Sequence, residues 1–380
     1  MTEARGAGQA GGVVISGMGV TSAFGRGTGP LLDGALSGQS AFGRVDRFDT
    51  GPCRVKVGAL LPGAPTLADE LAWVLNEAAK TAGLDAAELA RTPLLIGLHS
   101  DSAAARRPGA EPATGDTARL VAQLCGMAPP DRVYATACVA ASTAVADAAA
   151  MIMAGRAERV MVSAGFLVDA DVFWLFDAGR TLAADGQVRP FSAGRRGLLL
   201  GDAAAAVLLE ATAAAAGRGA APLARLAGWG RAGDAYHVCQ PHPGGSGLAR
   251  AIGAALERAK VDTSEVGYIN ASGTGTGASD ASETAALHLA LGHRAVTIPV
   301  SSTKSVHGHA LEASALLELV VTVLALQAGR LPVNAGYLAA DEACDLDLVL
   351  GTARAASPRY ALSLNAAFGG ANTALLLAAA

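Results

Sequence analysis

The chain has 380 residues, of which 51% are hydrophobic and 16% charged, so it carries enough apolar surface for one large core or two fused ones. A formal net charge of −4 and an aromatic share of 4% provide neither the basic field nor the stacking surface that nucleic-acid binding needs. Five cysteines without CxxC spacing argue against a zinc site and a disulfide framework, and they favour a reducing cytoplasm.

No membrane-spanning segment is expected. The apolar runs at 198–209 and 315–326 are interrupted by Asp202 and Glu318, and the first six residues lack the apolar core of a signal peptide. We therefore expect a soluble, cytoplasmic protein that binds neither a metal nor a membrane.

Strand-like and helix-like segments alternate along the chain. Residues 1–11 lack periodicity and are expected to form a flexible tail. Short apolar runs predict buried strands at 13–16, 94–98, 160–163, 266–271, 298–302 and 360–364. Longer, mostly Ala-rich or Leu-rich stretches predict helices at 70–82, 139–154, 279–291 and 310–328. This alternation predicts an α/β fold with helices on both faces of a sheet.

Cys138 lies where the strand-like run before it gives way to an Ala-rich helix, in Tyr134-Ala-Thr-Ala-Cys138. A thiol at a helix start meets unpaired N–H groups and the positive end of the helix dipole, and both favour the thiolate. The position therefore suits a nucleophile. The alternative is that Cys138 is a small buried hydrophobic residue, as cysteine often is.

Two further motifs follow downstream. One is Ser301-Ser-Thr-Lys304-Ser-Val-His307-Gly-His309, and the other is Phe368-Gly369-Gly370-Ala-Asn372. Together with Thr-Ala-Cys138, and in this order, they resemble the β-ketoacyl-[acyl carrier protein] synthases of fatty-acid and polyketide assembly. The similarity covers nearly the whole chain and extends to further segments, namely Val13 to Thr21, Arg189-Pro-Phe191, Gly201-Asp202 and Asp234 to His237.

This resemblance implies the thiolase fold, a five-layered αβαβα sandwich of two similar halves. We expect an N-terminal half over 12–228, which carries the nucleophilic Cys138, and a C-terminal half over 229–380, which carries the other motifs. The helices that follow Cys138 and His309 should meet near the centre.

The resemblance also assigns chemical roles. Cys138 would take an acyl group from the phosphopantetheine thioester of an acyl carrier protein, which supplies that cofactor, so no other cofactor is expected. The backbone N–H groups of Cys138 and Phe368 would form an oxyanion hole, with Gly369 and Gly370 in a turn too tight for Cβ atoms. Phe368 would gate an acyl tunnel; simple core packing is its alternative.

Other positions have supporting roles by the same resemblance. Glu283 and Glu318 match acidic positions that pair with Lys304, and the pair would position His309; either glutamate could instead lie on a solvated helix face. His309 would hydrogen-bond the thioester carbonyl oxygen, whereas His307 replaces a residue that is usually small or hydroxylated. The hydroxyls of Thr274 and Thr276 would hold the pantetheine arm.

Ser272 departs from the family pattern. It stands in Asn270-Ala-Ser272-Gly-Thr where decarboxylating synthases carry a second catalytic histidine. A hydroxyl donates one weaker hydrogen bond and cannot share positive charge, and losing one oxyanion donor slows a step by about two to three decades. Acyl transfer to an oxygen or nitrogen nucleophile, or cyclisation, is therefore the preferred outcome, with His309, alone or together with Ser272, taking the nucleophile's proton.

Two alternatives stay open. The chain could be a decarboxylating synthase with a modified site, or a non-catalytic partner subunit that resembles chain-length factors. A homodimer is expected, with sheet edges near 133–137 covered by the second copy, or else a heterodimer with another ketosynthase-like subunit. The segment between Gly97 and Cys138 is shorter than its family counterpart, and Arg106 to Gly109 and Pro112 predict turns there.

Overall fold

The computed structural model describes residues 12–99 and 114–380, so the predicted 1–11 tail and the predicted turns at 106–112 lie outside the described part. The helices are α1 (Thr28–Ser37), α2 (Leu67–Ala82), α3 (Ala86–Ala90), α5 (Thr114–Leu124), α6 (Ala140–Met153), α7 (Ala170–Ala178), α8 (Thr212–Gly217), α9 (Ser246–Ala259), α10 (Gly277–Leu291), α11 (Lys304–His307) and α12 (Ser314–Ala328). Short 3-10 helices η1 (Ala137–Val139) and η4 (Leu311–Ala313) precede α6 and α12.

The strands form two groups. The first comprises β1 (Val13–Ser22), β5 (Leu94–Leu98), β6 (Arg132–Tyr134), β7 (Arg159–Phe166) and β8 (Ala203–Ala211). The second comprises β9 (Ala224–Gly233), β10 (Val266–Asn270), β11 (Pro299–Ser301), β13 (Asp347–Leu348), β15 (Tyr360–Ala366) and β16 (Ala371–Ala379). Shorter strands are β2 (Gly25–Arg26), β3 (Gly43–Arg44), β4 (Val57–Gly58), β12 (Arg330–Leu331) and β14 (Arg354–Ala355).

The two strand groups repeat one topology. The first has the order β6-β5-β7-β8-β1, and the second has the order β11-β10-β15-β16-β9 with β13 added at its edge. In both, the first two pairings are parallel and the last two antiparallel. Val13 to Ile15 of β1 also pair with β9, which joins the groups edge to edge. The duplication expected from the resemblance is thus present in the strand pairing.

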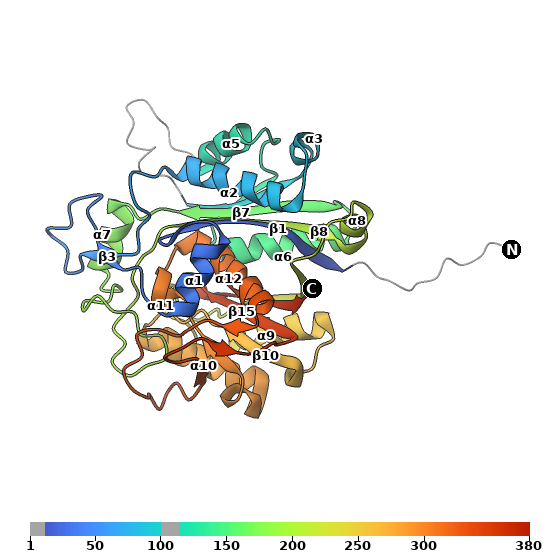
Figure 1. Cartoon of the computed structure of the whole chain (residues 1–380). Coiled ribbons are helices and arrows are strands. Elements are labelled where there is room, and N and C mark those ends of the chain that lie inside the picture. Colours follow the sequence, from blue (N-terminus) through green and yellow to red (C-terminus); the bar gives the residue numbers. More distant parts are fainter. Residues whose placement is uncertain (1–11, 100–113) are drawn as a thin grey trace.

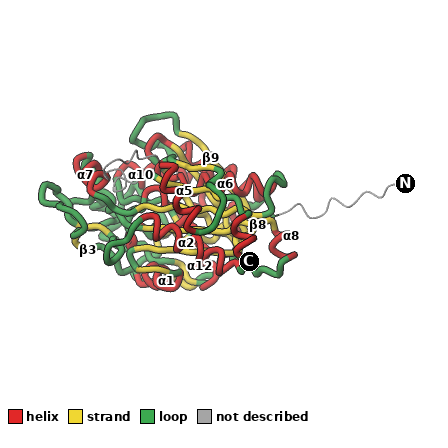
Figure 2. The backbone as a smooth tube through the Cα atoms, turned by 90° about the horizontal axis from the view of Figure 1, so that it is seen from above, coloured by secondary structure: helices red, strands yellow, loops and turns green. Residues whose placement is uncertain are grey.

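Five layers follow from this arrangement (Figure 1). Helices α2 and α5 cover the outer face of the β1-β8-β7 group, and α9 and α10 cover the outer face of the β10-β15 group. Helices α6 and α12 pack against each other between the two groups. Seen from above, the strands run through the middle of the molecule with helices around them (Figure 2). The predicted thiolase-type sandwich is confirmed.

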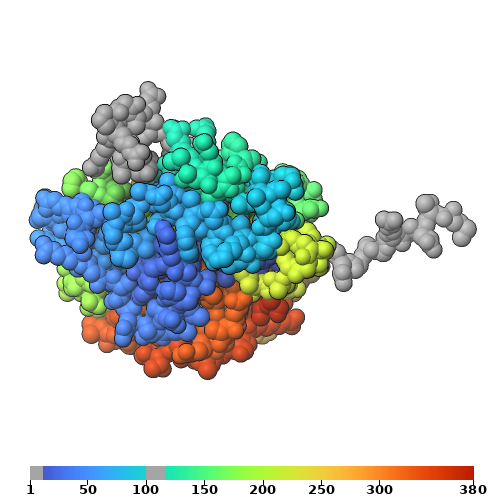
Figure 3. All heavy atoms as spheres, turned by 45° about the horizontal axis from the view of Figure 1, so that its top comes forward, coloured from blue at the N-terminus to red at the C-terminus, as the bar shows by residue number. Residues whose placement is uncertain are grey.

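The two halves also divide the surface. Residues of the N-terminal half cover the upper part of the face in Figure 3, and C-terminal residues cover the lower part. Between them, the 18-residue stretch Leu311–Ala328 is apolar and long enough to cross a membrane, but 89% of it is buried inside the protein. It is therefore the central core helix of the sandwich.

Small residues let helices approach the sheet closely. A Cβ at Gly19 of β1 would lie 2.1 Å from the Val74 carbonyl oxygen of α2, and one at Gly17 would lie 2.2 Å from the Ala78 oxygen. Strand β8 begins with four consecutive buried alanines, Ala203 to Ala206, between α2 and α12. The glycines thus let the outer helix α2 pack closely on β1, and the alanines of β8 let α2 and the central helix α12 pack on its two faces.

Candidate active site

Residues from both halves line a cavity of about 200 Å³ at the start of α6. Most of the residues predicted from the sequence contribute to it: Cys138, Ser272, Thr274, Thr276, Glu283, His309 and Phe368. Lys304 and Glu318 are buried directly behind this lining. The structure therefore brings together positions that are more than 200 residues apart in the chain.

Cys138 is the second residue of η1, directly before α6. The preceding Ala137 has a left-handed φ of 50°, an uncommon conformation for a residue with a side chain. Burial raises the pKa of the thiol to about 12, the Glu312 carboxylate adds to that rise, and Lys304 opposes it. The backbone N–H at the helix start lowers the pKa of Cys138 as predicted, but the loss of solvent outweighs it, so the thiol and not the thiolate is favoured.

His309 is held as a hydrogen-bond donor toward the cavity. Its Nδ1 accepts the Leu311 N–H at 3.0 Å and lies 3.2 Å from the Ser314 hydroxyl, so the neutral ring carries its hydrogen on Nε2. Burial, with Lys304 next, holds the pKa of His309 well below its usual value. The ring is thus neutral and has no free acceptor nitrogen, contrary to the expectation that His309 takes a proton from a nucleophile.

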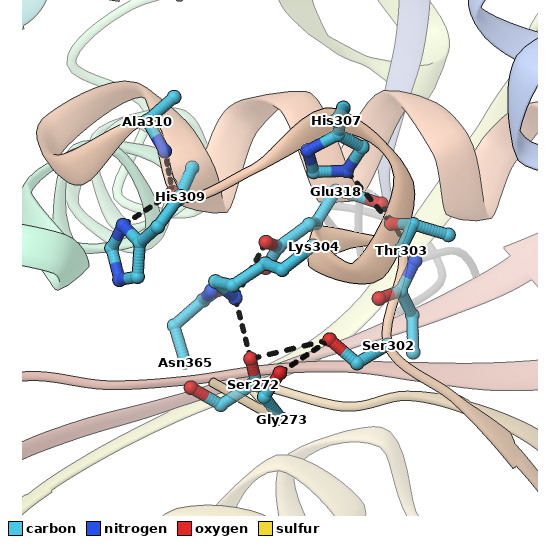
Figure 4. Close-up of polar contacts among 12 residues, drawn as sticks. Ser272, Gly273, Ser302, Thr303, Lys304, His307, His309, Ala310, Glu318 and Asn365 are labelled. Atoms are coloured by element: carbon cyan, nitrogen blue, oxygen red, sulfur yellow. Dashed lines mark hydrogen bonds and ion pairs between the residues drawn. The ribbon is translucent and has the colours of Figure 1, made fainter. Parts of the chain in front are cut away.

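Lys304 forms a buried ion pair behind the cavity (Figure 4). Its Nζ lies 2.6 Å from Glu318 Oε1 and donates to the Ser272 carbonyl oxygen at 2.7 Å. Asn365 Nδ2 donates to the other Glu318 oxygen at 2.6 Å. The predicted pairing of Lys304 with Glu318 is confirmed, and the solvated-face alternative for Glu318 is wrong, since its side chain is fully buried.

Glu283 has different partners from those expected. Its carboxylate accepts the Ser272 N–H at 2.8 Å and the Gly273 N–H at 2.7 Å, one on each oxygen, and it does not pair with Lys304. Burial raises the pKa of Glu283 to about 7, although these two backbone hydrogen bonds oppose the rise. The carboxylate therefore anchors the loop that carries Ser272 and also lines the cavity.

Ser272 lines the cavity together with His309. Its Oγ accepts the Ala366 N–H at 3.2 Å, which leaves its own hydrogen free to donate to a bound molecule. Within the described part of the chain, His309 is the one histidine that lines this cavity. His309 and Ser272 together thus offer one imidazole donor and one hydroxyl donor to the cavity.

Phe368 lies at the cavity wall and is 47% exposed, so core packing does not explain it. Its ring stacks on Phe176 of α7, with centroids 6.2 Å apart. Both following glycines have left-handed φ angles, 82° at Gly369 and 72° at Gly370. A Cβ at Gly370 would lie 2.8 Å from Asp234 Cβ, whereas a Cβ at Gly369 would meet no atom within 4 Å, so the crowding predicted at both positions holds at Gly370 alone.

The remaining predicted residues are also located. The hydroxyls of Thr274 and Thr276 lie 3.0 Å apart at the start of α10, and both side chains line the cavity. His307 is buried beside Thr303, with Nε2 2.9 Å from the Thr303 hydroxyl and Nδ1 2.8 Å from the Gly308 carbonyl oxygen. Burial lowers the pKa of His307 to about 3, so it is a neutral structural residue at the far end of α11 from the site (Figure 4).

Several residues at the site were not predicted, and three of them stand out. Phe176 and Cys239 line the cavity, and Glu312 is buried beside Cys138 with Oε1 3.4 Å from His99 Nδ1. The aromatic run Phe-Trp-Leu-Phe in α7 was a signal for an exposed apolar element. Nothing local to Cys239 or Glu312 in the sequence distinguishes them from ordinary surface residues.

Comparison with known proteins identifies the family. The N-terminal domain of β-ketoacyl synthases matches residues 71–215, and the C-terminal domain matches residues 223–337. The ketoacyl synthase alpha subunit of the tetracenomycin polyketide synthase of Streptomyces glaucescens is 33% identical in an alignment that covers 96% of this chain and 96% of that one. The chain belongs to the β-ketoacyl synthase family.

Further relatives and solved structures agree with this assignment. Nodulation protein E of Rhizobium meliloti is 40% identical over 244 residues, a match that spans 63% of this chain but 59% of that protein. The ishigamide ketosynthase/chain length factor superposes with a TM-score of 0.88 at 27% identity over 97% of this chain and 99% of that one. A β-ketoacyl synthase from Burkholderia phymatum STM815 gives a TM-score of 0.87 at 28% identity, with 97% and 100% covered.

Proposed function

We propose that this ketosynthase-family protein loads an acyl chain from an acyl carrier protein onto Cys138 and then transfers it to an oxygen or nitrogen nucleophile or cyclises it. The single observation that carries the proposal is the cavity lining, which pairs the His309 imidazole with the Ser272 hydroxyl in place of a second imidazole. One relative, from Synechocystis, is named 3-oxoacyl-[acyl-carrier-protein] synthase 2 and is 37% identical over 265 residues, which supports a carrier-protein substrate.

Loading requires a nucleophile, an oxyanion site and a leaving thiol. The Cys138 sulfur bonds to the thioester carbonyl carbon, the bond from that carbon to the pantetheine sulfur breaks, and the thiol proton passes to the departing sulfur. The Cys138 and Phe368 backbone N–H groups would form the oxyanion site: outside the helices and strands of the described residues neither donates to another backbone group, and the Cys138 N–H faces its own sulfur. Thr274 and Thr276 at the cavity wall would hold the pantetheine arm.

Extension by decarboxylation makes a stronger demand on the site. An enolate oxygen must be stabilised while carbon dioxide leaves, and here His309 Nε2–H and the weaker Ser272 hydroxyl are the side-chain donors. Loss of one good donor costs about two to three decades in rate. Acyl transfer from Cys138 needs no enolate, so it is the reaction that this site supports best.

The Cys138 thiol in the cavity lining disfavours the alternative of a non-catalytic partner subunit, which has no use for a nucleophile there. Strand β6 ends the sheet, and the exposed residues after it would be covered in a dimer, either with a second copy or with a related subunit. The solved ishigamide protein is named as a ketosynthase/chain length factor, and this similarity supports a heterodimer as the alternative to a homodimer.

The proposal is tested by intact-protein mass. Incubation with a set of acyl carrier protein thioesters should add one acyl mass to the protein, and addition of alcohol or amine acceptors should remove it with formation of the ester or amide. A protein that accepts no acyl group from any carrier thioester would contradict the proposal and favour the partner-subunit alternative.

A further inference from the structure

Discharge of acyl-Cys138 to a hydroxyl or amine needs a proton acceptor, and the geometry removes the obvious ones. His309 presents a donor nitrogen to the cavity, because Nδ1 is occupied by the Leu311 N–H. Lys304 is held by Glu318 and the Ser272 carbonyl. The Ser272 hydroxyl is itself too weak a base to hold a proton at neutral pH.

Glu283 is a buried carboxylate that lines the cavity, whereas Glu312, buried beside Cys138, is not among the lining residues. It reaches the cavity from α10, beside Ser272 and in the same lining as Cys138. Each of its oxygens accepts one backbone N–H, and a carboxylate oxygen has room for a second hydrogen. The other carboxylate in the lining, Asp234, also accepts one N–H on each oxygen, from Asn372 and His242, but it is only half-buried, so solvent reaches it.

We propose that Glu283 is the general base of the discharge step, an inference that rests on the proposed function. The acceptor oxygen or nitrogen bonds to the acyl carbon while its proton moves to the Glu283 carboxylate. The bond between that carbon and Cys138 sulfur then breaks, and the proton returns from Glu283 to the thiolate. Atoms and charge balance, and the enzyme regains its starting state with no other reactant.

The electrostatic surroundings suit this task. Burial raises the pKa of Glu283 to about 7, Asp280 on the same helix adds to the rise, and Lys304 opposes it. The nearby Cys138 and His309 stay uncharged at neutral pH, since burial raises the pKa of the first and lowers that of the second. A base is most effective when its pKa lies near the working pH, and general-base catalysis typically contributes about 10²- to 10⁴-fold.

The chain offers a matched control one turn earlier in α10. Asp280 is fully buried, accepts the Phe191 N–H at 2.8 Å and the Gly275 N–H at 3.1 Å, and has a pKa that burial raises to about 7. It resembles Glu283 in its burial, its two backbone partners and its raised pKa, but it lies outside the cavity lining and its Oδ2 is 3.8 Å from Arg195 Nε. Glu283→Gln and Asp280→Asn therefore impose the same loss on the backbone hydrogen bonds, and only the first removes the proposed base.

The experiment separates loading from discharge in single turnovers followed by intact mass. With an acyl carrier protein thioester, Glu283→Gln should load Cys138 within about threefold of the wild-type rate. Its transfer to a primary alcohol or amine should fall about 100-fold or more and lose the pH step near 7, whereas Asp280→Asn keeps both. Glu283→Asp, which retains the carboxylate, should recover part of the rate.

Hydroxylamine provides a second readout, because this strong nucleophile needs little base assistance and should discharge all variants alike. Wild-type transfer rates and an unchanged pH profile in Glu283→Gln, or equal losses in both variants, would overturn the inference. If carrier-protein thioesters fail to load even the wild-type protein, the proposed function fails instead. In that case Cys138 is acylated with a small-molecule thioester, and the discharge rates of Glu283→Gln and the wild type are compared on that acyl enzyme.

Discussion

The starts of α6 and α12 occupy equivalent places in the two halves. Each follows a 3-10 turn whose first residue has a left-handed φ, 50° at Ala137 and 41° at Leu311. The second residue of that turn is Cys138 in the N-terminal half and Glu312 in the C-terminal half, and the two turns pack against each other. The same turn geometry therefore carries the proposed nucleophile in one half and, in the other, a carboxylate that raises the pKa of that thiol.

Burial determines the protonation state of the residue at the start of α6. Burial comes first in raising the pKa of Cys138, and the Glu312 carboxylate adds to the rise. Glu312 Oε2 is buried with no hydrogen-bond partner among the described residues, and Oε1 faces His99. A turn that was expected to supply a thiolate therefore keeps a thiol at neutral pH.

The largest effect is expected from removing the nucleophile. Cys138→Ala should abolish the acyl mass added by a carrier-protein thioester. The other four cysteines, all within the described residues, do not lie in an equivalent turn before a helix, so none of them should replace Cys138. Cys239→Ala is the matched control, since Cys239 lines the same cavity from a loop. Acylation that survives in Cys138→Ala would assign the chemistry to another residue.

The next effect concerns the ion pair between Lys304 and Glu318, which lies behind the start of α12. Among the described residues, no such pair lies behind Cys138 at the start of α6. Lys304→Met leaves the Glu318 carboxylate buried without its partner and should lower the free energy of unfolding by about 3–5 kcal/mol. Denaturant unfolding measures this change. The double variant Lys304→Met/Glu318→Leu should regain most of it, and a loss below about 1 kcal/mol in the single variant would show that the pair is not energetically important.

The smallest effect separates the two turn residues. Removing the Glu312 charge lowers the pKa of Cys138, so Glu312→Gln should raise the rate of Cys138 alkylation by iodoacetamide at neutral pH, by about tenfold for each pKa unit removed. In the wild type that rate should rise about tenfold per pH unit from 6 to 9 without a plateau, because the pKa is about 12. A plateau near pH 7, or slower alkylation in Glu312→Gln, would contradict this electrostatic arrangement.

Much of the fold could be predicted from the sequence, because helices and strands depend largely on the pattern of apolar residues within each segment. The run at 94–98 is strand β5 as predicted, and the helix expected at 139–154 is α6. Strand β8 was not predicted, since Ala203 to Ala206 favour helix by intrinsic propensity and form a strand only because the space between two helix layers admits small side chains. Tertiary packing overrides local preference there.

The site was predictable in its members but not in its electrostatics. The motifs placed Cys138, His309 and Phe368 in one cavity, as observed. The direction of the Cys138 pKa shift, the hydrogen position on His309 and the backbone partners of Glu283 all depend on contacts between distant segments. Neither spacing nor composition encodes such contacts.

The most direct test of the proposed chemistry is release of carbon dioxide from labelled malonyl-carrier protein by the acyl-loaded wild-type protein. With Ser272 in place of a second imidazole, release should be slower by about two to three decades than discharge of acyl-Cys138 to an oxygen or nitrogen acceptor. Ser272→His should raise it where the cavity admits the larger ring. Rapid release of labelled carbon dioxide coupled to a β-ketoacyl product in the wild type would contradict the proposal and establish a decarboxylating synthase.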